Sequence, residues 1–512
     1  MKRIFFALFS IFLLCVIVLG QGVKREEGKV LGVEILSQEE IDLLCLDKEF
    51  LRFDSEIFFN QCPIGYDESQ NMLLIPQKLE NNFFDGEIES SEGRLVFLFD
   101  ELWFNKSTAM ADNHVFRLFW ISEEYYWMYN VYFSGMPIAK LSSEYIDENG
   151  ENNGSMWIYD QYSSNMRFQN EKCRFRERGS SSLVFPKVSY KIVFTEGKHS
   201  LLRMREDDDW ILNSLYDDEG LIHNKISYEL WRQIAASNQI PNDEGISMEF
   251  IEIFVDNQYQ GVYGLLERVD KKALGLNEKD ILYKGVDAKA AGDDDFYMEL
   301  TEEMSPAFEI KYPQTFEEEH WKPLKEWYYN FCVDKTKDYD EISKLLNIDN
   351  AVDYLLFNIF ISGDDNTQKN VYYWADYQAD GTYKMIKVPW DLNMTWGNAW
   401  CESHQYHFNI YQKKTIESAW GWTEDMEYLY QINPSEIGNK MKQRWSELRK
   451  NVITRDNLYR MLDKEFDFIH SSGSYKRDCM YWGSREELWS DSFIYEYAEQ
   501  KIIKMDEYIN SL

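Results

Sequence analysis

The chain has 512 residues, of which 44% are hydrophobic and 16% aromatic, so it can bury at least one large core and is not a disordered chain. Its 89 acidic residues outnumber its 54 basic residues, and the formal net charge is −35. This field repels nucleic acid and anionic membranes, and it admits a nucleotide only where a divalent cation and nearby Lys or Arg residues neutralise the phosphates.

The N-terminus carries a targeting pattern. Lys2 and Arg3 precede an apolar run over residues 4–19, which is typical of a signal peptide over residues 1–20, with an uncleaved N-terminal anchor as the alternative. Leu14 before Cys15 is too large for a lipoprotein signal. We therefore expect a secreted or cell-surface (extracytoplasmic) protein, which this segment, and no other, would tether to a membrane if it is retained as an anchor.

Six cysteines follow that segment, and outside the cytosol they allow up to three disulfides in 15 pairings. Cys45 with Cys62 would close a short local loop, while buried free thiols are an equal alternative. The six are Cys45, Cys62, Cys173, Cys332, Cys401 and Cys479.

Residues 30–170 alternate short apolar runs with turn residues, as in 95–99, 115–121 and 125–132. This pattern predicts a mainly β accessory region. The remainder, 171–512, mixes helices with hairpins and shows no regular βαβ alternation, which favours the α+β class. Helices are expected over 226–236, 436–450 and 494–509, and strands over 247–255 and 262–266.

The most informative stretch is 350–397. Its apolar spacing predicts a helix that ends near Ser362-Gly363, followed by a polar loop over 364–369. Two strand-like runs, 370–377 and 382–389, are then separated by Asp380-Gly381, a preferred pair for a two-residue hairpin turn.

With that turn, Asn370 is expected to lie opposite Asp391 on one face, with Cβ atoms about 4.5–5.5 Å apart. An amide oxygen and a carboxylate at this spacing could share one Mg²⁺ ion. Asp365 would then lie over the same end of the hairpin.

The order of these residues matches the demands of phosphoryl transfer. A kinase catalytic loop places an Asp that orients the acceptor hydroxyl five residues before a metal-binding Asn, and a second metal-binding Asp follows a hairpin. Asp365, Asn370 and Asp391 reproduce that order. Alone, such a spacing is a weak signal, because acidic loops at helix ends are usually only solvated.

Several further sequence blocks make the signal more specific than this spacing alone. In their order along the chain, they resemble the motifs of the CotH family of atypical, spore-coat-type protein kinases over about residues 170–512. The blocks are Arg178-Gly-Ser-Ser-Ser182 with Phe185-Pro-Lys187, Trp210-Ile-Leu-Asn213 with Tyr216-Asp217, Gln260 to Glu267, Leu282-Tyr-Lys-Gly285, Phe308 to Pro313, Asn370-Val-Tyr-Tyr-Trp374 and Val388 to Gly397.

The resemblance implies an atypical protein-kinase-like fold that binds ATP with Mg²⁺ or Mn²⁺ and phosphorylates Ser-type hydroxyls of a coat or cell-surface protein. By position, Asp365 would be the catalytic residue, and Asn370 and Asp391 the metal ligands. The residues implied for the nucleotide are Lys284 at the phosphates, Glu267 as its partner, and Arg178 and Lys187 as phosphate or structural contacts.

Two departures from the family pattern bear on activity. Asn393 stands where the family usually has a second Asp, which favours weaker metal binding or an inactive enzyme. Asp364 beside Asp365 leaves the catalytic assignment open by one position, although the spacing to Asn370 favours Asp365. No glycine-rich phosphate loop of an ordinary kinase or P-loop protein occurs, which this family tolerates.

Other functional patterns are weaker. Cys401, His404 and His407 have metal-like spacing but lack a fourth ligand for a structural zinc site. The acidic runs 206–209 and 293–295 do not fit an EF-hand loop, and no serine-hydrolase motif occurs. The alternative to a secreted kinase is a non-catalytic surface or coat protein that uses the fold, with its aromatic β region, to bind protein or polysaccharide.

Overall fold

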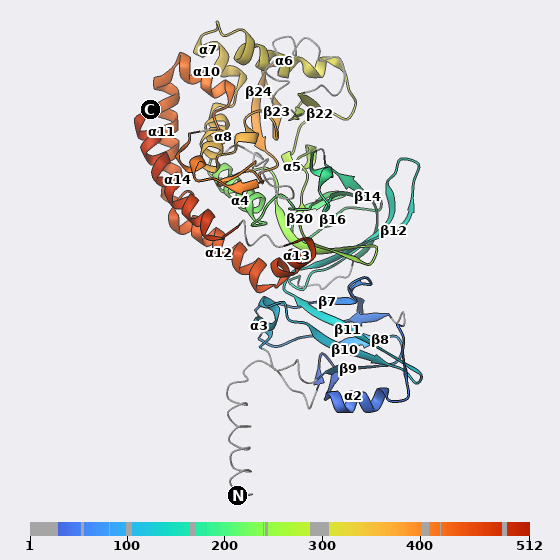
Figure 1. The fold of residues 1–512 in the computed structure, drawn as a ribbon. Helices are drawn as coiled ribbons and strands as arrows, with labels where there is room; N and C mark the ends of the chain where they lie inside the picture. Colours follow the sequence, from blue (N-terminus) through green and yellow to red (C-terminus); the bar gives the residue numbers. More distant parts are fainter. Residues whose placement is uncertain are drawn as a thin grey trace, which may run out of the picture.

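The fold is described from a computed structural model (Figure 1). The described residues are 29–52, 56–80, 82–98, 105–163, 169–179, 181–238, 240, 244–286, 307–400, 409–419, 421–483 and 489–512. The predicted signal or anchor segment therefore lies outside the described residues. Within them, no helix combines the length and apolar character needed to cross a membrane.

The N-terminal part is a mixed β-sheet with helix α2 (Gln38–Cys45) on one face, where Ile41 packs on apolar side chains of the central strands. The strand order is β1-β2-β9-β10-β11-β7-β6, with β3 also beside β11, and β4, β5 and β8 make a small separate sheet. The elements are β1 (Lys29–Val30), β2 (Val33–Leu36), β3 (Glu49–Phe50), β4 (Ile57–Phe59), β5 (Cys62–Pro63), β6 (Gly65–Asp67), β7 (Met72–Pro76), β8 (Ile88–Ser90), β9 (Arg94–Leu98), α3 (Lys106–Ala111), β10 (Phe116–Ile121) and β11 (Tyr125–Ser134).

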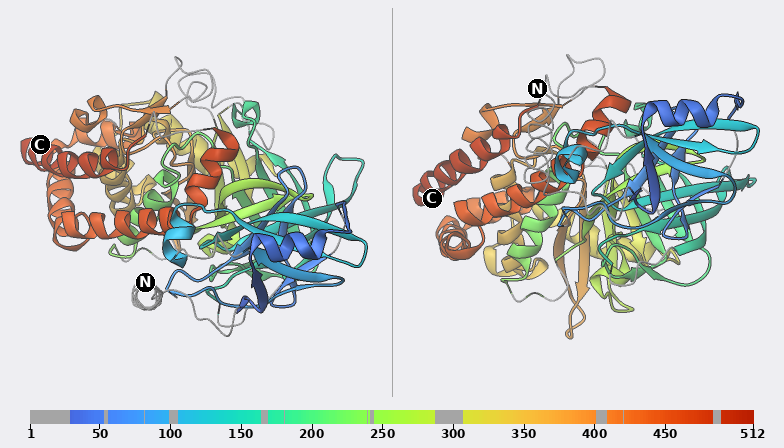
Figure 2. Two further views of the ribbon diagram at one scale, coloured as in Figure 1. Left: turned by 60° about the horizontal axis from the view of Figure 1, so that its bottom comes forward. Right: turned by 90° about the horizontal axis from the view of Figure 1, so that it is seen from below.

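A closed seven-stranded barrel follows in the order β12-β13-β14-β15-β18-β20-β19, closed by parallel pairing of β12 with β19. The predicted boundary at 170/171 falls inside β14, and two barrel strands precede it. The blue N-terminal sheet lies against the barrel in both views of Figure 2. The elements are β12 (Ile138–Ile146), β13 (Asn152–Tyr159), β14 (Gln169–Arg178), β15 (Ser189–Phe194), β18 (Asp209–Asn213), β19 (Met248–Val255) and β20 (Gln258–Leu266), with η2 (Ser181–Val184) and the hairpin of β16 (His199–Ser200) and β17 (Glu206–Asp207) between them.

The C-terminal part combines a four-stranded sheet with helices, which confirms the α+β class. Figure 1 shows the helices α11, α12 and α14 in orange and red along the side opposite the barrel strands. The sheet order is β22-β21-β23-β24. The elements are α4 (His223–Ala235), α5 (Lys271–Leu274), β21 (Ile281–Gly285), β22 (Phe308–Tyr312), η5 (Glu318–Trp321), α6 (Lys322–Tyr328), the π-helical turn η6 (Tyr329–Val333), α7 (Tyr339–Ile342), η7 (Ser343–Leu345), α8 (Ile348–Ile361), η8 (Asp364–Asn366), β23 (Val371–Tyr377), β24 (Tyr383–Pro389), β25 (Asn398–Trp400), β26 (Asn409–Tyr411), α9 (Lys414–Glu417), α10 (Glu424–Ile432), α11 (Pro434–Asn451), α12 (Arg455–Ser471), α13 (Ser474–Trp482) and α14 (Ser492–Ser511).

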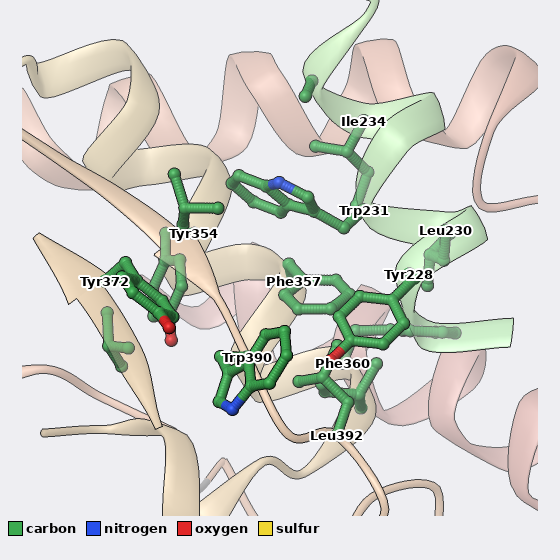
Figure 3. Packing of buried hydrophobic residues seen from close by; sticks show 14 of the residues in the cluster. Tyr228, Leu230, Trp231, Ile234, Tyr354, Phe357, Phe360, Tyr372, Trp390 and Leu392 are labelled. Atoms are coloured by element: carbon green, nitrogen blue, oxygen red, sulfur yellow. The ribbon is translucent and has the colours of Figure 1, made fainter. Parts of the chain in front are cut away.

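The main core lies where α4, α8 and the β23–β24 hairpin meet. Helix α8 is buried along nearly its whole length, consistent with a helix that is apolar on all sides. Figure 3 shows Trp390 close to Tyr372 of β23 and Tyr228 of α4, and the ring centroids are 5.9 and 6.5 Å apart. Trp390 is 5% exposed. This packing fixes the chain immediately before Asp391.

Candidate phosphate and metal site

The acidic loop begins where α8 ends. Ser362 terminates the helix in the left-handed conformation, with φ of 53°, and the short turn η8 follows. The buried Asn366 of this turn donates from Nδ2 to the carbonyl oxygens of Asn370 at 3.2 Å and Trp390 at 2.8 Å. Its own carbonyl accepts from the Tyr354 hydroxyl at 2.8 Å. One side chain therefore joins the loop to both ends of the hairpin.

Asn366 was not predicted as a site residue. The available signal was an uncharged amide within an acidic loop, but the sequence could not show that this amide is completely buried. Because it has two carbonyl acceptors in a water-excluded position, it holds the neighbouring side chains in place rather than contacting a ligand.

The predicted hairpin register is wrong by one residue. Val371 pairs with Pro389 and Tyr377 with Tyr383, which places Asn370 opposite Trp390 instead of Asp391. The cause is a three-residue loop: the Gln378 N–H donates to Thr382 O at 2.9 Å, and Gly381 has φ of 89°. A type I turn followed by a left-handed residue is the usual form of such a loop.

Asn370 and Asp391 still lie at the same end of the hairpin. The Trp390 N–H donates to Asn370 O at 3.0 Å, so the residue next to Asp391 is bonded directly to Asn370. Both residues have φ of 57°, and they lie just beyond the paired strands. Their side chains therefore leave the regular alternation of the sheet, which the pairing argument had assumed.

The predicted catalytic residue, Asp365, contacts Asn370. Nδ2 of Asn370 donates to Oδ2 of Asp365 at 2.8 Å, which leaves the amide oxygen as the acceptor end of the side chain. Nζ of Lys369 lies 3.1 and 3.4 Å from the two carboxylate oxygens of Asp365. The loop thus brings a carboxylate, an amide and an ammonium group together.

Asp391 is positioned from its backbone. Its N–H donates to the Tyr228 hydroxyl at 3.1 Å, while no hydrogen bond or ion pair to its carboxylate occurs within the described residues. Burial raises the pKa of Asp391, and the positive charges of Arg178 and Lys284 oppose this effect. The negative charge of Asp365 raises the pKa of Asp391 further. A partly buried carboxylate that interacts with cations and with a second carboxylate is suited to hold a divalent metal.

Two cations lie close enough to Asp391 to lower its pKa. Lys284 in β21 lies opposite Tyr372 of β23, and burial lowers the pKa of its ammonium group while Asp391 raises it. Arg178 ends β14, with its guanidinium carbon 6.0 Å from the ring centre of Trp390. Neither side chain forms a hydrogen bond or ion pair with another described residue. Both are therefore free to bind an anion.

Glu267 and Lys187 lie outside this group. The Glu267 carboxylate accepts from the N–H groups of Arg205 at 3.0 Å and Ser247 at 2.8 Å, and it makes no ion pair with Lys284. Glu267 lines a separate cavity of about 780 Å³, between the barrel, α4 and α12. Its contacts join two loops, so the carboxylate has a structural role in this conformation.

Lys187 is fully buried and donates to Asp478 Oδ1 at 2.5 Å and Val262 O at 2.6 Å. This places it between the barrel and helix α13. A completely buried, paired ammonium group is not accessible to a nucleotide phosphate, so the structural contact is the one observed for Lys187.

Asn393, at the position of the family's second Asp, donates from Nδ2 to Asp217 Oδ2 at 2.8 Å. A carboxylate at position 393 would face Asp217 with like charge, whereas the amide forms a hydrogen bond. The acidic character of this spot is therefore provided by Asp217.

The weaker patterns do not form sites in the described residues. In the run 206–209, Asp207 pairs with Arg205, Asp208 with Lys272, and Asp209 with Arg268. Cys401, His404, His407 and the run 293–295 lie outside the described residues. Nowhere in the described residues, the surroundings of Asp391 included, are three or more His, Cys, Asp or Glu side chains grouped to hold a metal. The five described cysteines outside that loop carry free thiols, including Cys45 and Cys62.

Two comparisons with known proteins place the chain among similar sequences. The family model described as "CotH kinase protein" matches residues 175–511. The chain is also 28% identical over 225 residues to the "Inner spore coat protein H" of Bacillus subtilis (strain 168). That match covers 43% of this chain and 58% of the relative, so the two proteins correspond over little more than half of the relative's length.

Proposed function

Because this chain belongs to the CotH kinase protein family, we propose that it is a metal-dependent protein kinase that transfers the γ-phosphoryl group of ATP to Ser-type hydroxyls. The observation that carries the proposal is the arrangement around Asp391. Its partly buried carboxylate lies near two cations, Lys284 and Arg178, that have no ionic partner among the described residues. In a chain with a net charge of −35, such free cations are what a polyphosphate would need.

The donor set fits a divalent cation. The Asn370 amide oxygen and the Asp391 carboxylate are hard oxygen ligands, which Mg²⁺ and Mn²⁺ prefer. When bound, the ion would supply positive charge to the phosphate oxygens. Lys284 and Arg178, which act electrostatically on Asp391, would bind phosphate oxygens, and Tyr228 would keep the Asp391 backbone in place.

Asp365 would act on the acceptor. Its carboxylate is positioned by Asn370, and it would accept the proton of the substrate hydroxyl as the oxygen attacks the phosphoryl group. Lys369 covers this carboxylate, but its side chain is 37% exposed and can move aside without disturbing the core. Catalysis here is mainly the positioning of charges, as expected for phosphoryl transfer.

We propose a coat or cell-surface protein as the substrate and an extracytoplasmic location for the reaction. The name of the Bacillus subtilis relative supports a coat association, and the N-terminal pattern supports export. The strongly negative charge argues against a nucleic-acid partner.

The test is phosphate incorporation from γ-labelled ATP by the full chain with Mg²⁺ or Mn²⁺. We expect labelling by the wild type and its loss in Asp391→Ala and Asp365→Asn. Asp364→Asn resolves the assignment between the adjacent carboxylates, and Asp380→Ala at the exposed hairpin tip is the matched control; both should retain labelling. Equal labelling in the wild type and Asp391→Ala would refute the site.

The second candidate is a non-catalytic coat or surface protein that retains the fold for interaction with protein or polysaccharide. The observation that favours it is Asn393, whose amide is used in a hydrogen bond to Asp217 and adds no charge to the metal site. ATP binding without phosphate transfer under any divalent metal would support this candidate over the kinase.

A further inference from the structure

We propose that Lys501, on the C-terminal helix α14, is a positioning residue for the loop that carries Asp365 and that it acts through Ser362. This inference deepens the proposed function and rests on it for the catalytic consequence. Its structural part, the control of the loop conformation by α14, can be tested without any enzyme activity.

The ammonium group of Lys501 is completely buried and fully hydrogen-bonded. Nζ donates to Ser362 Oγ at 2.9 Å, Thr415 O at 3.1 Å and Ser418 O at 2.7 Å. These three acceptors use all three ammonium hydrogens. All of them are neutral, and no carboxylate among the described residues forms an ion pair with Lys501.

Such a group is costly for stability. Burial lowers the pKa of Lys501 to about 7, because no negative charge compensates the lost hydration. An apolar side chain of similar length would fill the same space without this penalty. The three directed hydrogen bonds are therefore the specific contribution of a lysine at this position.

Ser362 is where these bonds act on the loop. It ends α8 with φ of 53°, a conformation that is uncommon for residues other than glycine and that must be held by its surroundings. The Tyr497 hydroxyl, also from α14, lies 2.8 Å from Ser362 Oγ and donates to Phe360 O at 2.6 Å. Two side chains of α14 thus fix the residue at which the chain turns from α8 into the acidic loop.

The loop is held at a second point by Asn366, which is bonded to Trp390 O and Tyr354. Only Gly363, Asp364 and Asp365 lie between the two fixed points. The direction in which the chain leaves Ser362 therefore decides where Asp365 lies. Loss of the α14 contacts would leave the Asp365 segment held at one end.

The test compares Lys501→Met, Ser362→Ala and the double variant by hydrogen–deuterium exchange of the segment 362–370 in the full chain. Ser362→Ala removes the hydroxyl but keeps a Cβ, so both residues have the same cost of a left-handed φ. Lys504→Met, one turn away, is the control, because the Lys504 side chain is 40% exposed and its ammonium group, among the described residues, pairs only with Glu507 at 3.5 Å. We expect exchange in this segment to be about tenfold faster in each single variant and unchanged in the control.

The double variant decides whether Lys501 acts through Ser362. We expect it to exchange no faster than the faster single variant, because residues that share one interaction are not additive. Additive effects, or wild-type exchange in Lys501→Met, would overturn the proposal. If Lys501→Met does not fold, Ser362→Ala alone still decides whether the contact controls the loop.

The catalytic readout is a split between kinetic constants. A misplaced Asp365 should lower kcat about 10- to 100-fold and change the KM for ATP less than about twofold, because the phosphate-binding cations are untouched. A fall in thermal stability with unchanged kcat would show a merely structural role and overturn the proposal. Absence of phosphate transfer by the wild type would instead refute the proposed function, while the exchange data would still decide the control of the loop.

Discussion

Asp391 carries a carboxyl group that the fold removes in part from water. Burial raises the pKa of Asp391, so between the ordinary carboxyl pKa of about 4 and its raised value the native state binds more protons than the unfolded chain. Stability therefore falls as the pH rises through that window and stays lower above it. A residue kept at such a cost is typical of a functional site.

The first prediction follows from this fall in stability with rising pH. Asp391→Asn keeps the shape of the side chain and removes its charge, so we expect a higher melting temperature than the wild type at pH 7 and little difference at pH 4. The same variant should lose Mn²⁺-dependent nucleotide binding. Asp380→Asn is the control of opposite sign, because hydrogen bonds from Thr382 lower the pKa of Asp380. A lower melting temperature for Asp391→Asn at pH 7 would contradict the assignment.

Lys187 illustrates a basic residue whose role depends on burial. Its ion pair with Asp478 is entirely buried, and Asp478 also accepts from the Val262 N–H at 2.8 Å. Removing only the ammonium group would leave an uncompensated carboxylate in the interior, which costs about 3–5 kcal/mol.

The second prediction is that Lys187→Met lowers the free energy of unfolding by about this amount and leaves the KM for ATP unchanged. Adding Asp478→Asn should restore part of the stability, because the buried charge is then absent. Chemical denaturation of the wild type, of Lys187→Met and of the double variant provides the measurement. A weaker affinity for ATP at unchanged stability would instead support the phosphate contact.

At the scale of elements, the sequence predicted the hairpin but not its register. Asp380-Gly381 indicated a turn correctly. However, both two- and three-residue loops can use a glycine with positive φ, so Gly381 does not tell which loop length forms. The shift of one residue did not separate Asn370 from Asp391, because both lie beyond the paired strands in left-handed conformations.

The helices were easier to predict than the contacts between them. The predicted 226–236, 436–450 and 494–509 match α4, α11 and α14 within a few residues, since amphipathic spacing is a local property. By contrast, the contact of α14 with Ser362 joins residues more than a hundred positions apart. No local pattern carries such information, and Lys501 was missed for this reason, whereas Asn366 was missed because its burial cannot be read from the sequence.

The third prediction concerns α14. The pKa of Lys501 is about 7 in the folded protein, against about 10.4 in an unfolded chain, so the unfolded state binds the extra proton between these values. The contribution of Lys501 to stability therefore increases with pH, by up to about 1.4 kcal/mol per pH unit. The free energy of unfolding of the wild type, relative to that of Lys501→Met, should increase between pH 7 and 9, as measured by denaturation at each pH. A constant difference would show that Lys501 is not neutralised by burial.

At the scale of the whole molecule, the N-terminal sheet and the barrel share buried polar contacts. Glu252 of β19 is completely buried and accepts from Arg477 of α13 at 2.8 and 2.9 Å. Ser134, at the end of the N-terminal sheet, and Tyr259 of β20 also donate to Glu252. Arg477 in turn donates to Asn113 Oδ1 at 2.7 Å.

These contacts explain why the change in sequence pattern at 170/171 does not coincide with a boundary between separate structural parts. The family match begins at residue 175, yet the barrel begins with β12, and Arg477 of α13 donates to Phe133 O in the N-terminal sheet at 3.2 Å. A buried network of this kind couples its parts, since a missing partner leaves a charge or polar group without compensation.

The fourth prediction is therefore that the N-terminal sheet and the barrel unfold together. We expect a single calorimetric transition for these two parts in the wild type. Arg477→Met should lower its midpoint by several degrees, because the Glu252 charge loses its bidentate partner at a cost of about 3–5 kcal/mol. Arg477→Met with Glu252→Gln should recover part of the loss. Lys476→Met is the matched control, because Lys476 lies next to Arg477 but pairs with Asp112 at the surface. Two separate transitions in the wild type, or equal midpoints for Arg477→Met and the control, would show that the sheet is an independent domain.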